Sequence, residues 1–421
     1  MKIKNLFLLV IIVCISGSLS AQNSTSSPYS MFGIGDISNN GFGRNLGMGG
    51  VSSSLISSFS LNPSNPATYS SLLQYAFLFE VGVSGNNYKL VTPNGTASKF
   101  DGNIRYIAMG FSVAKWWKAG FGLRPVTDIG YDIKQEFITE IDSNTMVNNY
   151  LGEGGINQFY FDNSFRIIKP LSIGLKVGYN FGYAKRTNSI TTINEYSTNY
   201  LVAVNQKNFS AFNFGLGLHF HQSLSDNLFL NVGATYNFKT ELSADFTRLI
   251  TSTTAKNKTE FTDTLYNGTI NEGLMDVPQS FSLGTSFILY QKLEIAADYQ
   301  VEKWSEAKFF GEKQNFKDNN KLCIGVEYLP DVNAIKYLNA IRYRAGFTLA
   351  NSYLVYNDIQ LKQTGGSLGF GLPLRSGSLI NVAFSYLKRY APGDNDLSES
   401  YFQIHLNFSL QASWFYRPKF E

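Results

Sequence analysis

The feature that most constrains this chain is an alternation of apolar and polar residues that recurs along its length. Residues 401–411 read YFQIHLNFSLQ, in which every second residue is apolar. Residues 173–184, 212–221 and 293–302 show the same pattern. Successive side chains of a β-strand point to opposite faces, so each segment predicts a strand with one apolar and one polar face.

The predicted connections between strands are short at one end of the sheet and long at the other. This asymmetry is typical of an outer-membrane β-barrel, which has short periplasmic turns and long external loops. The short connections are 115–118, 169–171, 222–227, 290–292 and 373–376. The long polar connections are 85–102, 135–156, 186–208, 241–276, 304–319, 352–363 and 388–399.

We therefore expect an all-β fold, a 14-stranded antiparallel transmembrane β-barrel with both termini in the periplasm. An eleven-residue strand tilted by ~45° covers about 25 Å, the height of the apolar band of such barrels. The apolar face contacts lipid and the polar face lines the lumen. The predicted number of strands stays open by two, because residues 136–150 and 353–361 are each ambiguous between strand and loop. The strands are 74–84, 103–114, 119–134, 157–168, 172–185, 209–222, 228–240, 279–290, 293–303, 320–329, 340–351, 364–372, 377–387 and 401–411.

The N-terminal segment has the organisation of a secretory signal peptide, residues 1–21. Two lysines precede an apolar run at 6–15 that is too short to span a bilayer as a helix, and small residues follow. Cleavage of the signal peptide after Ala21 and cleavage after Ser20 are both compatible with the sequence. The mature chain is nearly neutral, which gives no argument for binding nucleic acid. It retains only Cys323, which excludes an internal disulfide.

Residues 22–73 lie between the signal peptide and the first strand, and they do not alternate. They are rich in Gly, Ser and Asn and carry few charges, which suits a segment folded inside a small polar lumen. We name this segment the hatch. A plug inside the barrel is one interpretation, and a periplasmic tail that caps the barrel is the other. The barrel is predicted at 74–411 and a periplasmic tail at 412–421. The candidate hatch residues are Gly47, Gly49, Gly50, Asn62, Pro63, Asn65 and Pro66.

Two stretches resemble the FadL-like long-chain fatty acid transporter family. GRNLGMGGVSSSL followed by LNPSNPATYSSL resembles its Gly-rich hatch, and Asn65-Pro66-Ala67 matches the Asn-Pro-Ala motif before its first strand. VPQSFSLGTSFILYQKLEIAADYQVEKWSE at 277–306 resembles one of its hairpins. The resemblance implies a barrel that passes hydrophobic molecules. Relatives of the family also include partner-binding barrels of secretion and membrane-assembly machines.

Pro125 interrupts the third predicted strand. Proline has no backbone N–H to donate, so in a closed sheet it marks a bulge or a break. In the resembled family a kink in the third strand opens the wall sideways toward the membrane. The resemblance therefore implies a lateral opening at Pro125 and Gly130, and a plain bulge without an opening is the alternative.

Charged residues of both signs fall on the predicted inner face. One interpretation is a paired network that holds the hatch to the wall, since an unpaired charge in a confined lumen is costly. The other is that Arg342 and Arg344, two apart on one strand, bind the carboxylate of a ligand. The inward charges are Glu80, Arg105, Arg124, Arg166, Lys176, Glu294, Asp298, Glu302, Glu327, Arg342 and Arg344.

The sequence contains little that points to catalysis or to a cofactor. His219, His221 and His405 face the lumen, but their spacing matches no metal motif, so we expect no metal and no cofactor. Residues 365–369 fit G-x-S-x-G, which needs a strand–turn–helix elbow that is not predicted there. We therefore expect that the protein is not an enzyme.

Two functions remain from different classes. The first is passive uptake of hydrophobic, fatty-acid-like molecules across the outer membrane, with lateral exit near the third strand. The alternative is a structural or accessory subunit of a multi-protein outer-membrane complex for secretion or barrel assembly. The expected partners are outer-membrane lipid with either a hydrophobic ligand or other outer-membrane or periplasmic proteins. An apolar lumenal pocket favours the first, and a lumen filled by a salt-bridged plug favours the second.

Overall fold

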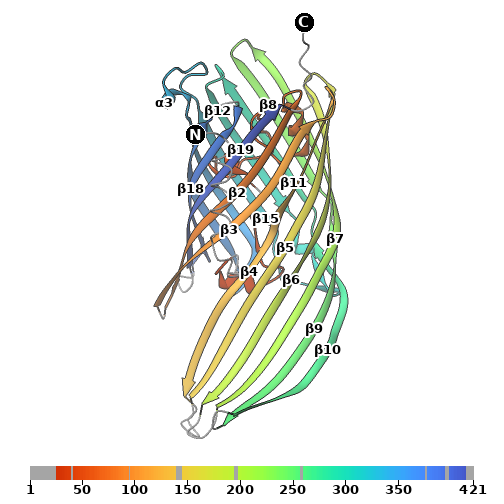
Figure 1. Ribbon diagram of the computed structural model, residues 1–421, viewed down its shortest axis with the longest axis vertical. Helices are drawn as coiled ribbons and strands as arrows, with labels where there is room; N and C mark the ends of the chain where they lie inside the picture. Colours follow the sequence, from red (N-terminus) through yellow and green to blue (C-terminus); the bar gives the residue numbers. More distant parts are fainter. Residues whose placement is uncertain are drawn as a thin grey trace.

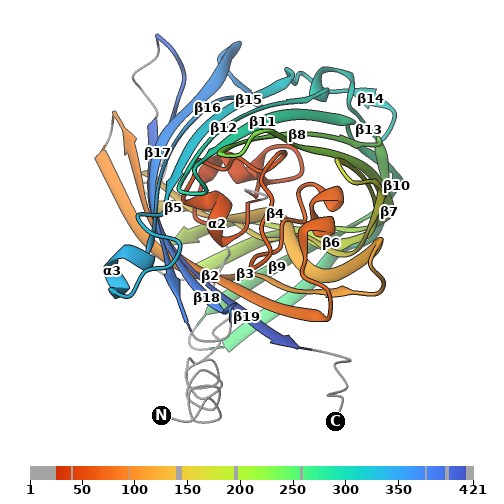
Figure 2. The same cartoon turned by 90° about the horizontal axis from the view of Figure 1, so that it is seen from above.

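The alternating segments pair in chain order and close into an antiparallel barrel of fourteen strands, which confirms the predicted fold (Figures 1 and 2). The computed structural model describes residues 25–38, 41–93, 95–138, 145–193, 198–256, 259–374, 377–393 and 398–413. The first and last strands join along sixteen paired residues, from Ser398 opposite Val91 to Ser413 opposite Ala76. The predicted signal peptide and residues 414–421 of the predicted tail lie outside the described residues.

The fourteen barrel strands follow one another around the wall. Two of them, β8 and β11, are each continued beyond the rim by a further strand. The barrel strands are β2 (Ala76–Thr92), β3 (Gly95–Ser112), β4 (Trp117–Ile138), β5 (Thr145–Ile168), β6 (Leu171–Ile193), β7 (Thr198–Ser225), β8 (Leu228–Asn237), β11 (Ser280–Leu289), β12 (Leu293–Glu302), β15 (Asn319–Tyr328), β16 (Arg342–Tyr356), β17 (Ile359–Pro373), β18 (Leu379–Tyr390) and β19 (Ser398–Ser413). The continuations are β9 (Thr240–Lys256) and β10 (Thr259–Val277).

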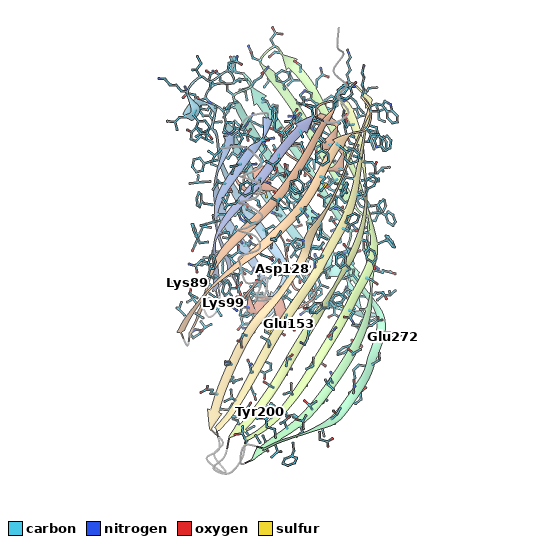
Figure 3. The ribbon with its side chains drawn as sticks, viewed as in Figure 1. Lys89, Lys99, Asp128, Glu153, Tyr200 and Glu272 are labelled. Carbon is cyan, nitrogen blue, oxygen red and sulfur yellow. The ribbon has the colours of Figure 1, made fainter. Side chains whose placement is uncertain are left out.

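The faces of the strands are oriented as the alternation predicts. Leu175 is 43% exposed and Leu216 opposite it is 40% exposed, whereas Lys176 between the apolar positions is 4% exposed. The last strand repeats this order, with Phe402 and Ile404 exposed and Asn407 buried. Figure 3 shows side chains covering the outer surface of the barrel. Apolar residues therefore form the lipid-facing surface and polar residues the inner surface.

Most of the predicted long loops are strands, which corrects that part of the prediction. Predicted loops 135–156, 186–208 and 241–276 belong instead to β4–β7, β9 and β10, which extend far beyond the rest of the rim (Figure 1). We call this extension the raised wall (residues 124–138, 145–157, 181–193, 198–210, 240–256 and 259–277). β7 alone has 28 residues. At ~3.3 Å per residue and a tilt of ~45° such a strand rises about 65 Å, more than twice the apolar band of a membrane.

The remaining elements are short. The hatch contains η1 (Pro28–Met31), β1 (Asp36–Ile37), α2 (Gly43–Leu46) and η2 (Pro66–Ser71). The connection after β12 contains η3 (Trp304–Glu306), β13 (Lys308–Phe309) and β14 (Glu312–Lys313), and α3 (Tyr337–Ala340) lies between β15 and β16. None of the helices in the described part of the chain is both long and apolar enough to cross a membrane.

Candidate functional site

The hatch lies inside the barrel, and its described residues are mostly buried against the inner wall (Figure 2). Met48 and Val51 are 0% exposed and Leu55 is 1% exposed, and all three belong to one buried cluster with Cys323 of β15. Phe42 stacks on Tyr106 of β3 with ring centroids 3.4 Å apart. The structure therefore places this segment in the lumen as a plug, stacked and packed against several strands.

Arg44 of the hatch forms ion pairs with two strands of the wall. Its guanidinium pairs with Glu294 of β12 and, at 3.0 Å, with Glu327 of β15. Burial alone would lower the pKa of Arg44, but the nearby carboxylates of Glu327 and Glu294 outweigh burial and raise it above its ordinary value. Removing one member of such a buried group leaves an uncompensated charge, so these pairs fix the hatch against the wall.

Arg342 and Arg344 belong to the same cluster. Arg344 Nε lies 2.6 Å from Glu327 and Arg342 Nη1 lies 3.1 Å from it. Both arginines therefore pair with a carboxylate of the protein itself, and binding of a ligand carboxylate by this pair stays a prediction. Arg44 was not among the predicted site residues, although its place in the Gly-rich stretch GRNLG, where charges are few, was a usable signal.

The other hatch residues predicted from the sequence touch the wall or hold the hatch turns. Asn65 Nδ2 donates to the Ser53 carbonyl at 2.7 Å and to the Leu218 carbonyl of β7 at 3.0 Å. Lys176 of β6 donates to the Pro63 carbonyl. Pro66 lies against Gly174 and Gly217, where a Cβ on either glycine would overlap the hatch backbone or Asn65. The inner glycines of β6 and β7 thus let the Asn-Pro-Ala segment approach the wall closely.

Glycines and amides at the other end of the hatch make equally close contacts. Gly49 has φ +68° and donates to Ser367 Oγ at 2.9 Å, so the serine of the G-x-S-x-G segment holds the hatch. Gly47 lies against Gly369 of β17. Gly50 donates to the Asn45 carbonyl at 2.8 Å, and Asn62 Nδ2 donates to the Ser52 carbonyl at 2.6 Å.

The barrel wall is not continuous between β3 and β4. These strands pair only from Ile107 opposite Leu123 to Ser112 opposite Lys118, although both extend further. We call the unpaired stretch, between residues 95–106 and 124–138, the lateral seam, and Figure 1 shows the two ribbons diverging there. Pro125 marks its start, with a register shift between Pro125 and Thr127 against β5.

Hatch residues cover part of the seam. β1 pairs with β4 through Asp36 opposite Asp128 and Ile37 opposite Thr127, so the hatch supplies a short strand where β3 is missing. The Gly130 amide lies 3.1 Å from Ser30 Oγ of the hatch. Pro125 and Gly130 therefore both lie on the strand that borders the seam, and Gly130 contacts the hatch.

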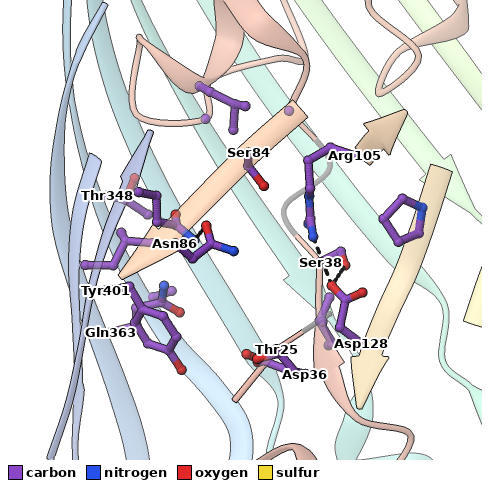
Figure 4. Close-up of a pocket in the computed structure, with 18 of the residues that line it drawn as sticks. Thr25, Asp36, Ser38, Ser84, Asn86, Arg105, Asp128, Thr348, Gln363 and Tyr401 are labelled. Carbon is purple, nitrogen blue, oxygen red and sulfur yellow. Dashed lines mark hydrogen bonds and ion pairs between the residues drawn. The ribbon is translucent and has the colours of Figure 1, made fainter. Parts of the chain in front are cut away.

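A cavity of about 200 Å³ lies between the hatch and the strands on both sides of the seam (Figure 4). Its lining includes Arg105 of β3, Asp128 of β4 and Gln363 of β17. Arg105 Nη1 and Ser38 Oγ both bind Asp128, at 3.0 and 2.7 Å. Charged and polar groups therefore dominate the walls that Figure 4 labels.

An apolar core lies beside the hatch on the side of the raised wall. Trp304 stacks on Tyr353 at 4.3 Å between ring centroids, and Tyr353 Oη donates to the Gly35 carbonyl of the hatch at 2.7 Å. Ile129 and Leu242 of the raised wall belong to the same core and are 0% exposed. This core was not predicted, because 304–319 and 352–363 were expected to be polar connections between strands. The aromatics in those loops were the available signal.

The lumenal histidines make ordinary polar contacts. His219 lies 3.2 Å from the Ser54 carbonyl of the hatch, His221 lies 2.7 Å from Asn231, and His405 lines the cavity at the seam. Among the described residues no group of three or more His, Cys, Asp or Glu side chains is placed to hold a metal ion.

Comparisons with solved structures agree with this architecture. A toluene transporter of Pseudomonas putida, TodX, matches with a TM-score of 0.60 and 18% identity, over 91% of this chain and 100% of that chain. The toluene transporter TbuX of Ralstonia pickettii matches at 0.54 and 16%, over 88% and 98%. A Pseudomonas aeruginosa FadL homologue matches at 0.53 and 12%, over 88% and 97%. These likenesses confirm the predicted FadL-like outer-membrane barrel fold.

Comparison of the sequence, rather than of the structure, identifies the family of this chain. No curated protein sequence matches the chain. The family model described as BamG matches residues 2–421, which is all but the first residue. This protein therefore belongs to the BamG family.

Proposed function

We propose that this protein is a non-catalytic structural subunit of a multi-protein outer-membrane complex. The observation that carries the proposal is the buried ion-pair cluster of Arg44 with Glu294 and Glu327, which holds the hatch to the wall. An uptake channel needs a path past its hatch, and a group of buried charges resists displacement because each partner left behind would be unpaired. The apolar core around Trp304 adds further contacts between the wall and the hatch, through Tyr29 and Ile34.

The raised wall supports the same proposal. Its strands continue far beyond the height that a membrane requires, and uptake of a small molecule does not need such a surface. We place the short turns and both termini in the periplasm, as is usual for barrels of this type, and the raised wall outside the cell. The wall then offers a rigid surface to other proteins at the cell exterior.

Native mass spectrometry of the protein purified gently from its own membrane tests this proposal. We expect the barrel in stoichiometric association with other proteins and without added apolar mass. A lone barrel that carries a bound hydrophobic molecule would contradict it.

Uptake of hydrophobic molecules with lateral exit is the second candidate, and the lateral seam is the observation that favours it. The cavity beside the seam borders Pro125 and Asp128 of β4, so a molecule leaving that cavity would pass the edge of the wall. The solved barrels with the same fold include two named as toluene transporters. The charged lining argues against a long apolar chain as the cargo.

Replacing Pro125 by valine tests the second candidate. Valine restores a backbone donor and favours regular strand geometry at the seam. If the seam is an exit, uptake of a hydrophobic probe into vesicles containing the protein should fall at least fivefold, while the folded barrel keeps its heat-dependent gel mobility. Unchanged uptake with the folded barrel intact would remove lateral exit as a function.

A further inference from the structure

The outer edge of β10 is open. One side of this strand pairs with β9 from Thr259 to Val277, and the other side pairs only at Met275, opposite Phe309. Within the described part of the chain, residues 259–273 thus have a strand neighbour on one side only. Unpaired edge strands present free backbone donors and acceptors, which is the usual template for adding a strand from another chain.

The side chains of this edge are unusually apolar for a surface in water. Phe261 is 68% exposed, Leu265 57% and Leu274 48%, and Tyr266 and Ile270 are each 40% exposed. They lie on the raised wall, beyond the height of the lipid-facing band. Lipid therefore does not account for their exposure, whereas a partner protein that covers the edge would.

The charges on this edge all have one sign. β10 contains Glu260, Asp263, Glu272 and Asp276 and no lysine or arginine. Asp276 is buried and pairs with Lys239 at 3.0 Å, whereas Glu260, Asp263 and Glu272 are exposed. Figure 3 places Glu272 at the outer margin of the raised wall. Three exposed carboxylates on an open edge favour a cationic segment over a neutral or acidic one.

The same charges disfavour a second copy of this chain. Two β10 edges paired with each other would bring six exposed carboxylates together, and like charges on adjacent strands are destabilising. Two register shifts, between Thr264 and Tyr266 and between Thr269 and Asn271, also make the edge irregular. Bulges are a common means of preventing indiscriminate edge pairing.

The direction of the backbone at the inner end of the edge is known. The Leu274 carbonyl accepts from the Phe310 amide at 2.8 Å, so the polar groups of Leu274 point away from β9. In an antiparallel strand this direction repeats every second residue, so the polar groups of Glu272 point outward as well. Glu272 therefore presents both a free backbone amide and a carboxylate to an added strand.

The other margin of the raised wall differs from the β10 edge in strand pairing and in charge. β4 is partly covered there by β1, which pairs with Thr127 and Asp128. Its exposed charges beyond that point are mixed, with Asp132, Lys134 and Glu136. This margin is therefore a suitable internal control.

We propose that the outer edge of β10, residues 260–273, binds an extended, lysine- or arginine-rich segment of a partner protein by strand addition. This inference rests on the proposed structural role and names the kind of partner and the surface that takes it.

Synthetic peptides are the first probe. A nine-residue peptide of alternating lysine and valine should bind the protein in lipid nanodiscs at least tenfold more tightly than its glutamate–valine counterpart, as measured by fluorescence anisotropy. Binding should weaken at 0.5 M salt, because exposed charges are screened. The triple variant Glu260→Lys, Asp263→Lys, Glu272→Lys should reverse the preference. The control Asp132→Lys, Glu136→Lys on β4 should leave it unchanged. Equal binding of both peptides, or an effect of the β4 control as large as that of the triple variant, would overturn the inference.

A matched pair at Glu272 separates backbone pairing from charge. Glu272→Ala removes the carboxylate and keeps the amide, whereas Glu272→Pro removes both while sparing the bonds to β9. Glu272→Pro should bind the basic peptide at least fivefold more weakly than Glu272→Ala. If heat-dependent gel mobility shows that both variant barrels are folded, equal affinities would mean that no strand is added.

Native mass spectrometry of the triple variant, purified from its own membrane, distinguishes failure of the β10 inference from failure of the proposed function. Loss of a partner that the unchanged protein retains would support the edge as its binding site. A complex that persists in the triple variant would overturn the β10 inference alone. Detection of the unchanged protein without any partner would instead count against the proposed function.

Discussion

Replacing Arg44 by methionine should make Cys323 react with a maleimide about a hundredfold to a few thousandfold faster than in the unchanged protein. Cys323 is 3% exposed and lies in one buried apolar cluster with Met48, Val51 and Leu55 of the hatch, so displacement of the hatch would uncover this cluster. The substitution leaves Glu294 and part of the charge of Glu327 without their hatch partner. Breaking a buried pair costs roughly 3–5 kcal/mol, which corresponds to that range of opening equilibria.

The experiment uses the only cysteine in the described residues and in the mature chain, so the unchanged protein serves as its own reporter. Lys185→Met is the matched control, because the pair of Lys185 with Glu153 at 2.8 Å is about one third exposed on both sides. Such exposed pairs contribute about 0–1 kcal/mol. Equal reactivity of Cys323 in the Arg44 and Lys185 variants would show that the ion-pair cluster does not hold the hatch.

Replacing Leu175 by lysine should lower the free energy of unfolding in lipid vesicles by roughly 2–4 kcal/mol, the cost of a cation on the lipid face of a barrel near mid-depth. Leu175 is 43% exposed and lies opposite Leu216 on a face of large apolar residues. Denaturant titration followed by tryptophan fluorescence measures the change.

Leu265→Lys on the raised wall gives the corresponding control. Leu265 is 57% exposed, more than Leu175, but it lies beyond the lipid-facing band. A surface substitution in water usually changes stability by less than about 0.5 kcal/mol. If the two lysines cost the same, the boundary between the lipid-facing barrel and the raised wall is misplaced.

The barrel could be predicted from sequence because lipid imposes a strong rule on it. Where one face meets lipid and the other meets the hatch, residues must alternate, and 172–185 shows this clearly. The number of strands, their order and the faces of Leu175 and Lys176 followed from that rule. Residues 251–255 and 260–264 are paired strands whose side chains are partly or fully exposed on both faces, so no alternation marks them.

The candidate site was predictable only in part. The Asn-Pro-Ala motif and the Gly-rich stretch indicated which residues belong to the hatch, and Pro125 indicated where the wall is interrupted. The partner of each charge was not predictable, because Arg44 and Glu327 are separated by 283 residues and meet only after the barrel closes. Arg389 and Asp36, 2.6 Å apart, are a second such pair between wall and hatch. One-dimensional spacing contains no information about these contacts.

The short tether between hatch and barrel has a consequence for how the hatch behaves once its contacts break. η2 ends at Ser71 and β2 begins at Ala76, so only residues 72–75 separate the last helix of the hatch from the first wall strand. A segment held by so short a linker stays at an effective concentration on the order of millimolar near its binding surface. Each contact can therefore be individually weak, and a displaced hatch rebinds as an intramolecular ligand rather than diffusing away.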